Sequence, residues 1–179
     1  GLEEDVIKAL SKRLASTTIG APTAEGVRMG PLASRSQVHA VRSAAEMIRH
    51  GAELVFGGGD FEVVGADREK GSCFAPMLMV CDQPLTRLEA HDVEAFGPVN
   101  TVMPYHSIEE AIQLARMGKG SLVGSLISAD PTVARRVILG TAALQIAGWI
   151  DVSKSIYTGS NLLWLSHLLG GLLFGVGMV

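Results

Sequence analysis

Hydrophobic residues in the first third of the chain recur at the spacing of amphipathic helices. The first helical pattern has Leu2, Val6, Leu10 and Leu14 on one face, and we expect this helix to end before Gly20. A second pattern follows Ser34, a good N-cap, and its apolar face consists of Val38, Val41, Ala45 and Ile48. We expect Gly51 to end this helix in a left-handed conformation. Residues 19–34, rich in glycine and proline, predict a connecting loop.

Short apolar runs predict strands at residues 52–56, 74–80, 99–105 and 122–127. Ser107 and Glu110 have the spacing of a capping box, which predicts a helix from there to Gly118. Asp130 followed by a proline predicts another helix start, and we expect that helix to end before Gly140. Strands separated by helices of these lengths predict an α/β fold.

The distribution of charge divides the chain near residues 141–146. Residues 143–179 carry Lys154 and Asp151 as their only charged side chains, out of 15 Lys and Arg and 18 Asp and Glu in the whole chain. We therefore expect an α/β domain over residues 1–142, followed by an apolar, helical tail over residues 143–179. Residues 161–179 are long and apolar enough for a transmembrane helix. The alternative is a very apolar core helix or hairpin of a soluble fold.

Composition also excludes several classes of function. A net charge of -3 does not fit nucleic-acid binding. Cys73 and Cys81 are too few for a disulfide scaffold, and neither has a neighbouring cation or helix start to activate it as a nucleophile. The five histidines are scattered, so we predict no metal site; His91 is expected to be solvated. The acidic start of the chain does not fit a signal peptide, and we expect a cytoplasmic protein, membrane-associated if the tail spans a bilayer.

The string E-A-F-G-P-V at residues 94–99 is the best candidate for chemistry. A carboxylate at a turn can accept hydrogen bonds from a ribose diol, and an aromatic ring can lie against a planar heterocycle. Glu94 and Phe96 could serve these two roles, with Gly97 and Pro98 fixing the turn. The other interpretation is that Glu94 is a solvated loop residue and Phe96 a core residue.

Several ordered motifs make residues 1–142 resemble the aldehyde dehydrogenase superfamily. They are G-A-P at 20–22, M-G-P-L at 29–32, G-S-C-F-A-P at 71–76, E-A-F-G-P-V at 94–99 and L-V-G-S-L at 122–126, the last lying before the D-P helix start. Within the family, the runs V-R-M-G-P-L at 27–32 and E-A-H-D-V-E-A-F-G-P at 89–98 are most similar to the semialdehyde dehydrogenase part of the bifunctional ring-opening enzymes of phenylacetate degradation.

This resemblance implies oxidation of an aldehyde or semialdehyde, such as a CoA-linked semialdehyde of phenylacetate degradation, to the acid with NAD or NADP as cofactor. It also implies that the intact enzyme is a homo-oligomer. A cysteine thiolate attacks the aldehyde, the adduct gives hydride to the nicotinamide, and water activated by a glutamate releases the acyl group. Glu94 corresponds to the residue that binds the nicotinamide ribose, and Phe96 to the ring near the nicotinamide. The family's nucleophile and base precede the region matching residue 1. We therefore expect no catalytic residue here and no turnover by this fragment alone.

The tail carries a separate resemblance. Residues 146–179 are similar to sulfur-transport membrane proteins of the YeeE/YedE type, on the glycine-rich string L-L-G-G-L-L-F-G-V-G-M-V at 168–179. The alternative function is therefore a membrane-associated fragment of a transport protein. A further alternative is an interaction module that pairs open sheet edges with a complementary fragment.

Overall fold

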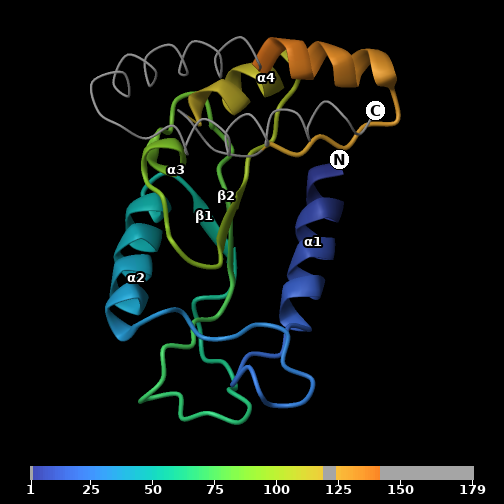
Figure 1. Cartoon of the computed structure of the whole chain (residues 1–179). Coiled ribbons are helices and arrows are strands. Elements are labelled where there is room, and N and C mark those ends of the chain that lie inside the picture. Colours follow the sequence, from blue (N-terminus) through green and yellow to red (C-terminus); the bar gives the residue numbers. More distant parts are fainter. Residues whose placement is uncertain (1, 119–123, 142–179) are drawn as a thin grey trace, which may run out of the picture. The chain divides into compact units, whose positions relative to one another are not determined.

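The computed structural model describes residues 2–118 and 124–141. The chain divides into two compact units, Gly1–Pro104 and Tyr105–Val179. The first unit contains helices α1 (Leu2–Ala15), α2 (Arg35–Arg49) and α3 (Glu89–Asp92) and strands β1 (Glu53–Phe56), β2 (Met77–Val80) and β3 (Val99–Val102), as Figure 1 shows. The second unit contains α4 (Ile108–Met117) and a helical segment at residues 131–141.

The three strands form one sheet in the order β1-β2-β3, in which β2 runs antiparallel to β1 and parallel to β3. Leu54 is opposite Met79 and Phe56 is opposite Leu78, so Val55 is an extra residue in β1 and forms a β-bulge. The long connection from β1 to β2 has no helix. The fold is thus mixed α/β, but helices do not alternate with strands throughout as the sequence predicted.

The core lies between α2 and one face of the sheet. Its buried residues are Val38, Val41, Ala45, Ile48, Ala52, Phe74, Met77, Met79 and Cys81, which include the whole predicted apolar face of α2. Leu78 is also buried but lies outside this cluster, because neighbouring residues of a strand point to opposite faces. The helix α1 lies on the side of the sheet away from α2 (Figure 1) and keeps Leu2, Val6 and Leu10 exposed.

Polar side chains fix the predicted helix starts. Ser34 Oγ accepts the backbone N–H of Gln37 at 3.1 Å, and Ser107 Oγ accepts that of Glu110 at 3.1 Å. Asp130 Oδ1 accepts the N–H of Thr132 at 2.8 Å, at the start of the 131–141 helix. All three N-caps are confirmed.

Two glycines differ from the predicted helix ends. The helix α2 does end just before Gly51, but Gly51 does not have the predicted left-handed conformation. The φ of Gly51 is not positive, and α2 ends at Arg49 with His50 as a right-handed C-cap. A Cβ at Gly51 would collide with Glu89 Oε2, so the lack of a side chain gives room to that carboxylate. Gly140 lies inside the helical segment, where a Cβ would be 2.7 Å from Ile112 Cδ1. The left-handed conformation of Gly51 and the helix end before Gly140 were thus wrong, because each glycine lies against a side chain distant in sequence.

The predicted strand at 122–127 is also wrong over its described part. Residues 124–127 are irregular and exposed, and Ile127 is 98% exposed. Residues 122 and 123 lie outside the described residues. An apolar run becomes a strand only when a partner supplies the hydrogen bonds, and β3 is paired only with β2 among the residues that the structure describes.

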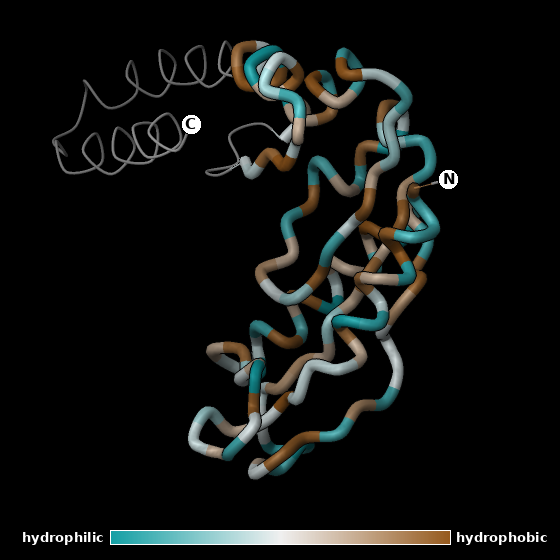
Figure 2. Tube along the Cα trace, turned by 90° about the vertical axis from the view of Figure 1, so that its right-hand side faces the viewer, coloured by the Kyte–Doolittle hydropathy of each residue, from teal (hydrophilic) through white to brown (hydrophobic). Residues whose placement is uncertain are grey.

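The predictions for the tail, including the transmembrane helix at 161–179 and the transport-protein resemblance at 146–179, lie outside the described residues. None of the helices at residues 2–118 and 124–141 has the length and apolar character needed to cross a membrane. Along this part of the chain hydrophobic and hydrophilic residues alternate in short stretches, as Figure 2 shows, which is typical of elements with one buried face.

Candidate functional site

The candidate residues Glu94 and Phe96 lie on the segment that joins α3 to β3. Val93 and Ala95 pack against the core cluster, whereas Glu94 and Phe96 are exposed, Phe96 by 69%. This alternation is typical of extended chain, in which residues i and i+2 point to the same side, roughly 6.6 Å apart. The carboxylate and the ring are therefore both exposed, two residues apart on the same segment. The interpretation of Phe96 as a core residue was wrong.

The turn that follows is tied to the sheet. Gly97 N–H donates to Ala95 O at 2.7 Å, and Val99 N–H donates to Gly97 O at 2.8 Å. Pro98 O accepts the N–H of Met77 at 2.9 Å, directly before the parallel pairing of β2 with β3 begins. The position of the turn is thus set by the central strand of the sheet.

A glutamine that the sequence interpretation missed holds the same turn from α2. Gln37 Nε2 donates to Phe96 O at 2.7 Å, and Gln37 Oε1 accepts the N–H of Ala33 at 2.9 Å. The available signal was the S-x-x-Q spacing from Ser34 to Gln37, the same capping-box pattern that was recognised at Ser107. The contact with Phe96 had no sequence signal, because it joins residues 59 positions apart.

Two other motifs of the sequence meet beside this helix start. Leu32 N–H donates to Ser72 O at 2.9 Å, and Ser72 Oγ donates to Leu32 O at 2.6 Å. The M-G-P-L segment is therefore bonded to the G-S-C-F-A-P segment, and Ala33 continues from it to Gln37. Three motifs that are far apart in the sequence, at 29–32, 71–76 and 94–99, are joined by these hydrogen bonds.

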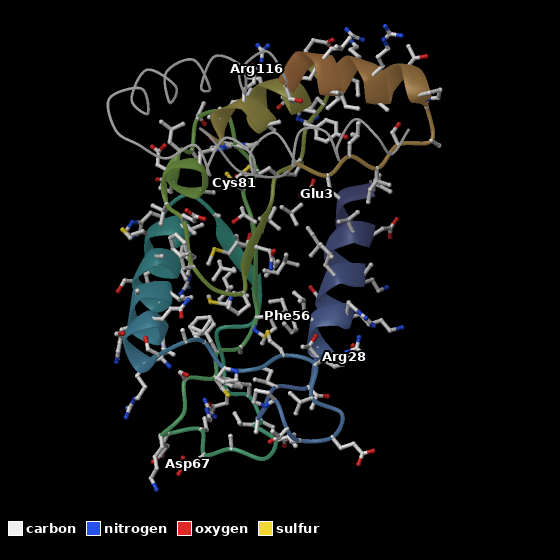
Figure 3. All side chains as sticks on the ribbon, in the orientation of Figure 1. Glu3, Arg28, Phe56, Asp67, Cys81 and Arg116 are labelled. Atoms are coloured by element: carbon white, nitrogen blue, oxygen red, sulfur yellow. The ribbon has the colours of Figure 1, made fainter. Side chains whose placement is uncertain are left out.

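The cysteines of the described residues are placed for packing. Cys73 is 8% exposed and Cys81, which directly follows β2 (Figure 3), is 0% exposed. Burial raises the pKa of the Cys81 thiol, partly opposed by a hydrogen bond with the Gln83 backbone. A high pKa keeps a thiol protonated and so poorly nucleophilic.

The histidine predictions have different outcomes. His106, directly before the Ser107 N-cap, is exposed. His91 is half-buried, and its Nε2 lies 2.8 Å from Pro84 O, so the expectation of a solvated ring was wrong. Residues 2–118 and 124–141 hold no group of three His, Cys, Asp or Glu side chains that could bind a metal ion.

Two surface hollows of about 520 Å³ each lie elsewhere in the first unit. One is lined by residues of α1, β1 and the end of α2, such as Glu3 and Arg49, and by Arg87 from the segment between β2 and α3. The other lies between α2 and α3 and includes Met47, Leu88 and Val93. Neither is lined by Glu94 or Phe96. Glu94 and Phe96 are both exposed, outside these two hollows.

Comparison with known proteins places this geometry in a family. The model of the aldehyde dehydrogenase family matches residues 1–154. The 3,4-dehydroadipyl-CoA semialdehyde dehydrogenase of Aromatoleum evansii is 41% identical over 146 residues, which cover 81% of this chain and 28% of that protein. The chain thus spans less than a third of that relative's length.

Solved structures of aldehyde dehydrogenases have a similar fold. A betaine aldehyde dehydrogenase double mutant from Staphylococcus aureus, in complex with NAD+, has a TM-score of 0.67 at 28% identity, over 76% of this chain and 27% of that one. A succinic semialdehyde dehydrogenase from Streptococcus pyogenes, in complex with NADP+, has the same fold with a TM-score of 0.66 at 24% identity, over 77% of this chain and 29% of that one. The family model matches most of this chain, and the fold is that of solved aldehyde dehydrogenases. The chain therefore belongs to the aldehyde dehydrogenase family.

Proposed function

We propose that this chain is part of the catalytic domain of an NAD(P)-dependent aldehyde dehydrogenase and that it holds the nicotinamide end of the cofactor. In this proposal Glu94 accepts hydrogen bonds from the nicotinamide ribose, and the Phe96 ring lies against the nicotinamide. Both are binding roles. No residue among those described is assigned to covalent catalysis.

The observation that carries the proposal is the exposure of both Glu94 and Phe96, two residues apart on an anchored segment. An exposed phenylalanine costs hydrophobic free energy unless something covers it, and a planar heterocycle is a suitable cover. An adjacent carboxylate can accept two hydrogen bonds from a vicinal diol. Together the two side chains fit a nucleoside whose base and sugar are presented on one side.

The cofactor supplies a hydride acceptor when it is bound, and the contribution of this chain is to hold and orient it. Glu94 fixes the sugar, and Phe96 limits where the nicotinamide ring can lie. Hydrogen bonds to the carbonyls of Ala95, Gly97 and Pro98 hold the backbone that carries these two side chains. Structural relatives are known with NAD+ and with NADP+, and either cofactor is compatible with contacts to the nicotinamide half.

The proposed substrate of the intact enzyme is a semialdehyde linked to CoA. The support is the name of the relative from Aromatoleum evansii, which acts on such a compound, at 41% identity. A role in phenylacetate degradation and a homo-oligomeric intact enzyme, both implied by the sequence resemblance, belong to the same proposal.

Binding of oxidised nicotinamide mononucleotide to the 179-residue chain, followed by NMR, tests the cofactor role. Glu94→Ala should weaken binding roughly tenfold or more, because hydrogen bonds to a charged group contribute about 1.5–3 kcal/mol. The matched control is Glu62→Ala, which removes another exposed glutamate of the same unit and should leave the affinity unchanged. Equal affinities of Glu94→Ala and the unchanged chain would contradict the proposal.

An activity assay tests the expectation that this chain does not turn over aldehyde by itself. The purified chain is mixed with an aldehyde and NAD or NADP, and reduced cofactor is measured by its absorbance. We expect no reduction above the background, because both described cysteines are buried. Robust reduction that Cys73→Ala or Cys81→Ala abolishes would show that one of them is a nucleophile after all.

A further inference from the structure

We infer that Gln37 is a positioning residue for the candidate cofactor site, acting through the backbone of Phe96. The inference rests on the proposed function, because it concerns how the Glu94 and Phe96 side chains are presented. Gln37 touches neither of these side chains in the hydrogen bonds observed; its amide bonds to the carbonyl between Phe96 and Gly97. It therefore controls the place of the turn rather than its chemistry.

The geometry of Gln37 suits this role because both ends of its amide are used. Oε1 is held by the Ala33 N–H at 2.9 Å, which fixes the direction of the amide plane, and Nε2 then reaches Phe96 O at 2.7 Å. The backbone of Gln37 is fixed as well, since its own N–H donates to Ser34 Oγ. Two side-chain hydrogen bonds and one backbone hydrogen bond thus fix Gln37, and they offset the rotamer freedom that its side chain loses.

The Phe96 carbonyl is well placed to transmit this constraint. Glu94 lies two residues before it on the same side of the segment, and Gly97 directly after it packs against Val41 of α2. On the far side, Pro98 is bonded to β2. The sheet therefore holds the end of the segment and Gln37 holds its middle, where the two exposed side chains are attached. Without Gln37, the part from Glu94 to Phe96 would keep the packing of Val93 and Ala95 and the bond from Gly97 N–H to Ala95 O, but would lose its hydrogen bond to α2.

Two substitutions of Gln37 distinguish the role of its Oε1 from that of its Nε2. Gln37→Glu keeps an oxygen for the Ala33 N–H but replaces the donor to Phe96 O with an acceptor. Gln37→Met removes both hydrogen bonds without adding charge. Gln113→Glu, at an exposed glutamine of α4 in the other unit, is the control for the change of charge. All are made in the full 179-residue chain.

The first measurement is amide hydrogen exchange at Gly97 and Val99, compared with amides of α2. We expect exchange at these two amides to become about tenfold faster in Gln37→Glu and Gln37→Met, the effect of losing one hydrogen bond, and to stay unchanged in Gln113→Glu. The Ala33 amide should lose protection in Gln37→Met alone. This pattern would not arise from general destabilisation, which would raise exchange in α2 as well.

The second measurement is the affinity for oxidised nicotinamide mononucleotide. We expect a loss of about fivefold or more in both Gln37 variants, with the neutral Gln37→Met excluding a purely electrostatic effect of the new carboxylate. Unchanged exchange at Gly97 and Val99, or faster exchange with unchanged affinity, would overturn the role of Gln37 while the proposed function stands. A wild-type chain that binds no mononucleotide would overturn the proposed function and this inference together, even if Gln37 holds the turn.

Discussion

Gly97 lies against Val41, so closely that a Cβ on Gly97 would be 2.7 Å from Val41 Cγ2 and 2.8 Å from Cγ1. Val41 is 1% exposed and belongs to the core cluster, so it has little room to move. The turn after Phe96 can therefore approach α2 only because residue 97 has no side chain.

Gly97→Ala should destabilise the first unit by about 1–3 kcal/mol, since the added methyl overpacks the core. Urea unfolding measures the effect as a lower midpoint. Gly59→Ala is the control, because a Cβ there meets no atom within 4 Å. In the double variant Gly97→Ala with Val41→Ala, the cost should be less than the sum of the single costs; an additive result would show that these two residues do not clash.

Gly57 and Gly51 should differ in their tolerance of alanine, although a Cβ would collide with an oxygen at both. At Gly57 the oxygen belongs to the Pro76 backbone and φ is +89°, whereas at Gly51 it is the end of the flexible Glu89 side chain and φ is not positive. We expect Gly57→Ala to lower the free energy of unfolding by at least about 1–2 kcal/mol. Gly51→Ala should lower it by less than about 1 kcal/mol. Thermal unfolding compares the two, and an equal cost would contradict the distinction. Adding Glu89→Ala should remove any cost specific to Gly51→Ala.

Burial of Cys81 predicts a loss of stability at alkaline pH. Its pKa in the folded chain is raised above the ordinary value of 9.0. The stability that the protonated Cys81 thiol contributes is therefore fully present below pH 9.0. It is lost as the pH rises through the pKa of the folded chain, because the unfolded chain releases this proton at a lower pH than the folded chain does. Urea midpoints between pH 8 and about pH 10.5 should fall more steeply for the unchanged chain than for Cys81→Ala. Cys73→Ala, which keeps the Cys81 thiol, should retain the steeper fall; identical slopes for all three chains would refute the prediction.

Local signals in the sequence predicted local structure well. The starts of three helices followed from Ser34, Ser107 and Asp130, because a cap needs only a side-chain oxygen and the N–H groups two or three residues later. The motifs that carry the family resemblance, with Glu94 and Phe96 among them, were likewise visible as short strings.

Features set by distant neighbours were not predictable in the same way. A left-handed Gly51 and a helix end before Gly140 were predicted from local pattern alone. The close contacts with Glu89 and Ile112, which favour glycine at these positions, come from residues distant in sequence. The apolar run before Ser128 was interpreted as a strand. A strand needs a neighbouring strand to pair with, and the local sequence does not show whether one is present. Gln37 was overlooked because its partner is 59 residues away.

The β-bulge in β1 should allow this strand to lose one residue without a change of pairing. Removing one residue from a strand normally turns every later side chain to the opposite face. Here Val55 is the residue without a partner between the pairs Leu54–Met79 and Phe56–Leu78, and its deletion would bring those two pairs into consecutive register. In evolutionary terms, a one-residue gap aligned at Val55 would leave the facing of Phe56 and the course of β2 intact, so length variation at this point is compatible with the same fold.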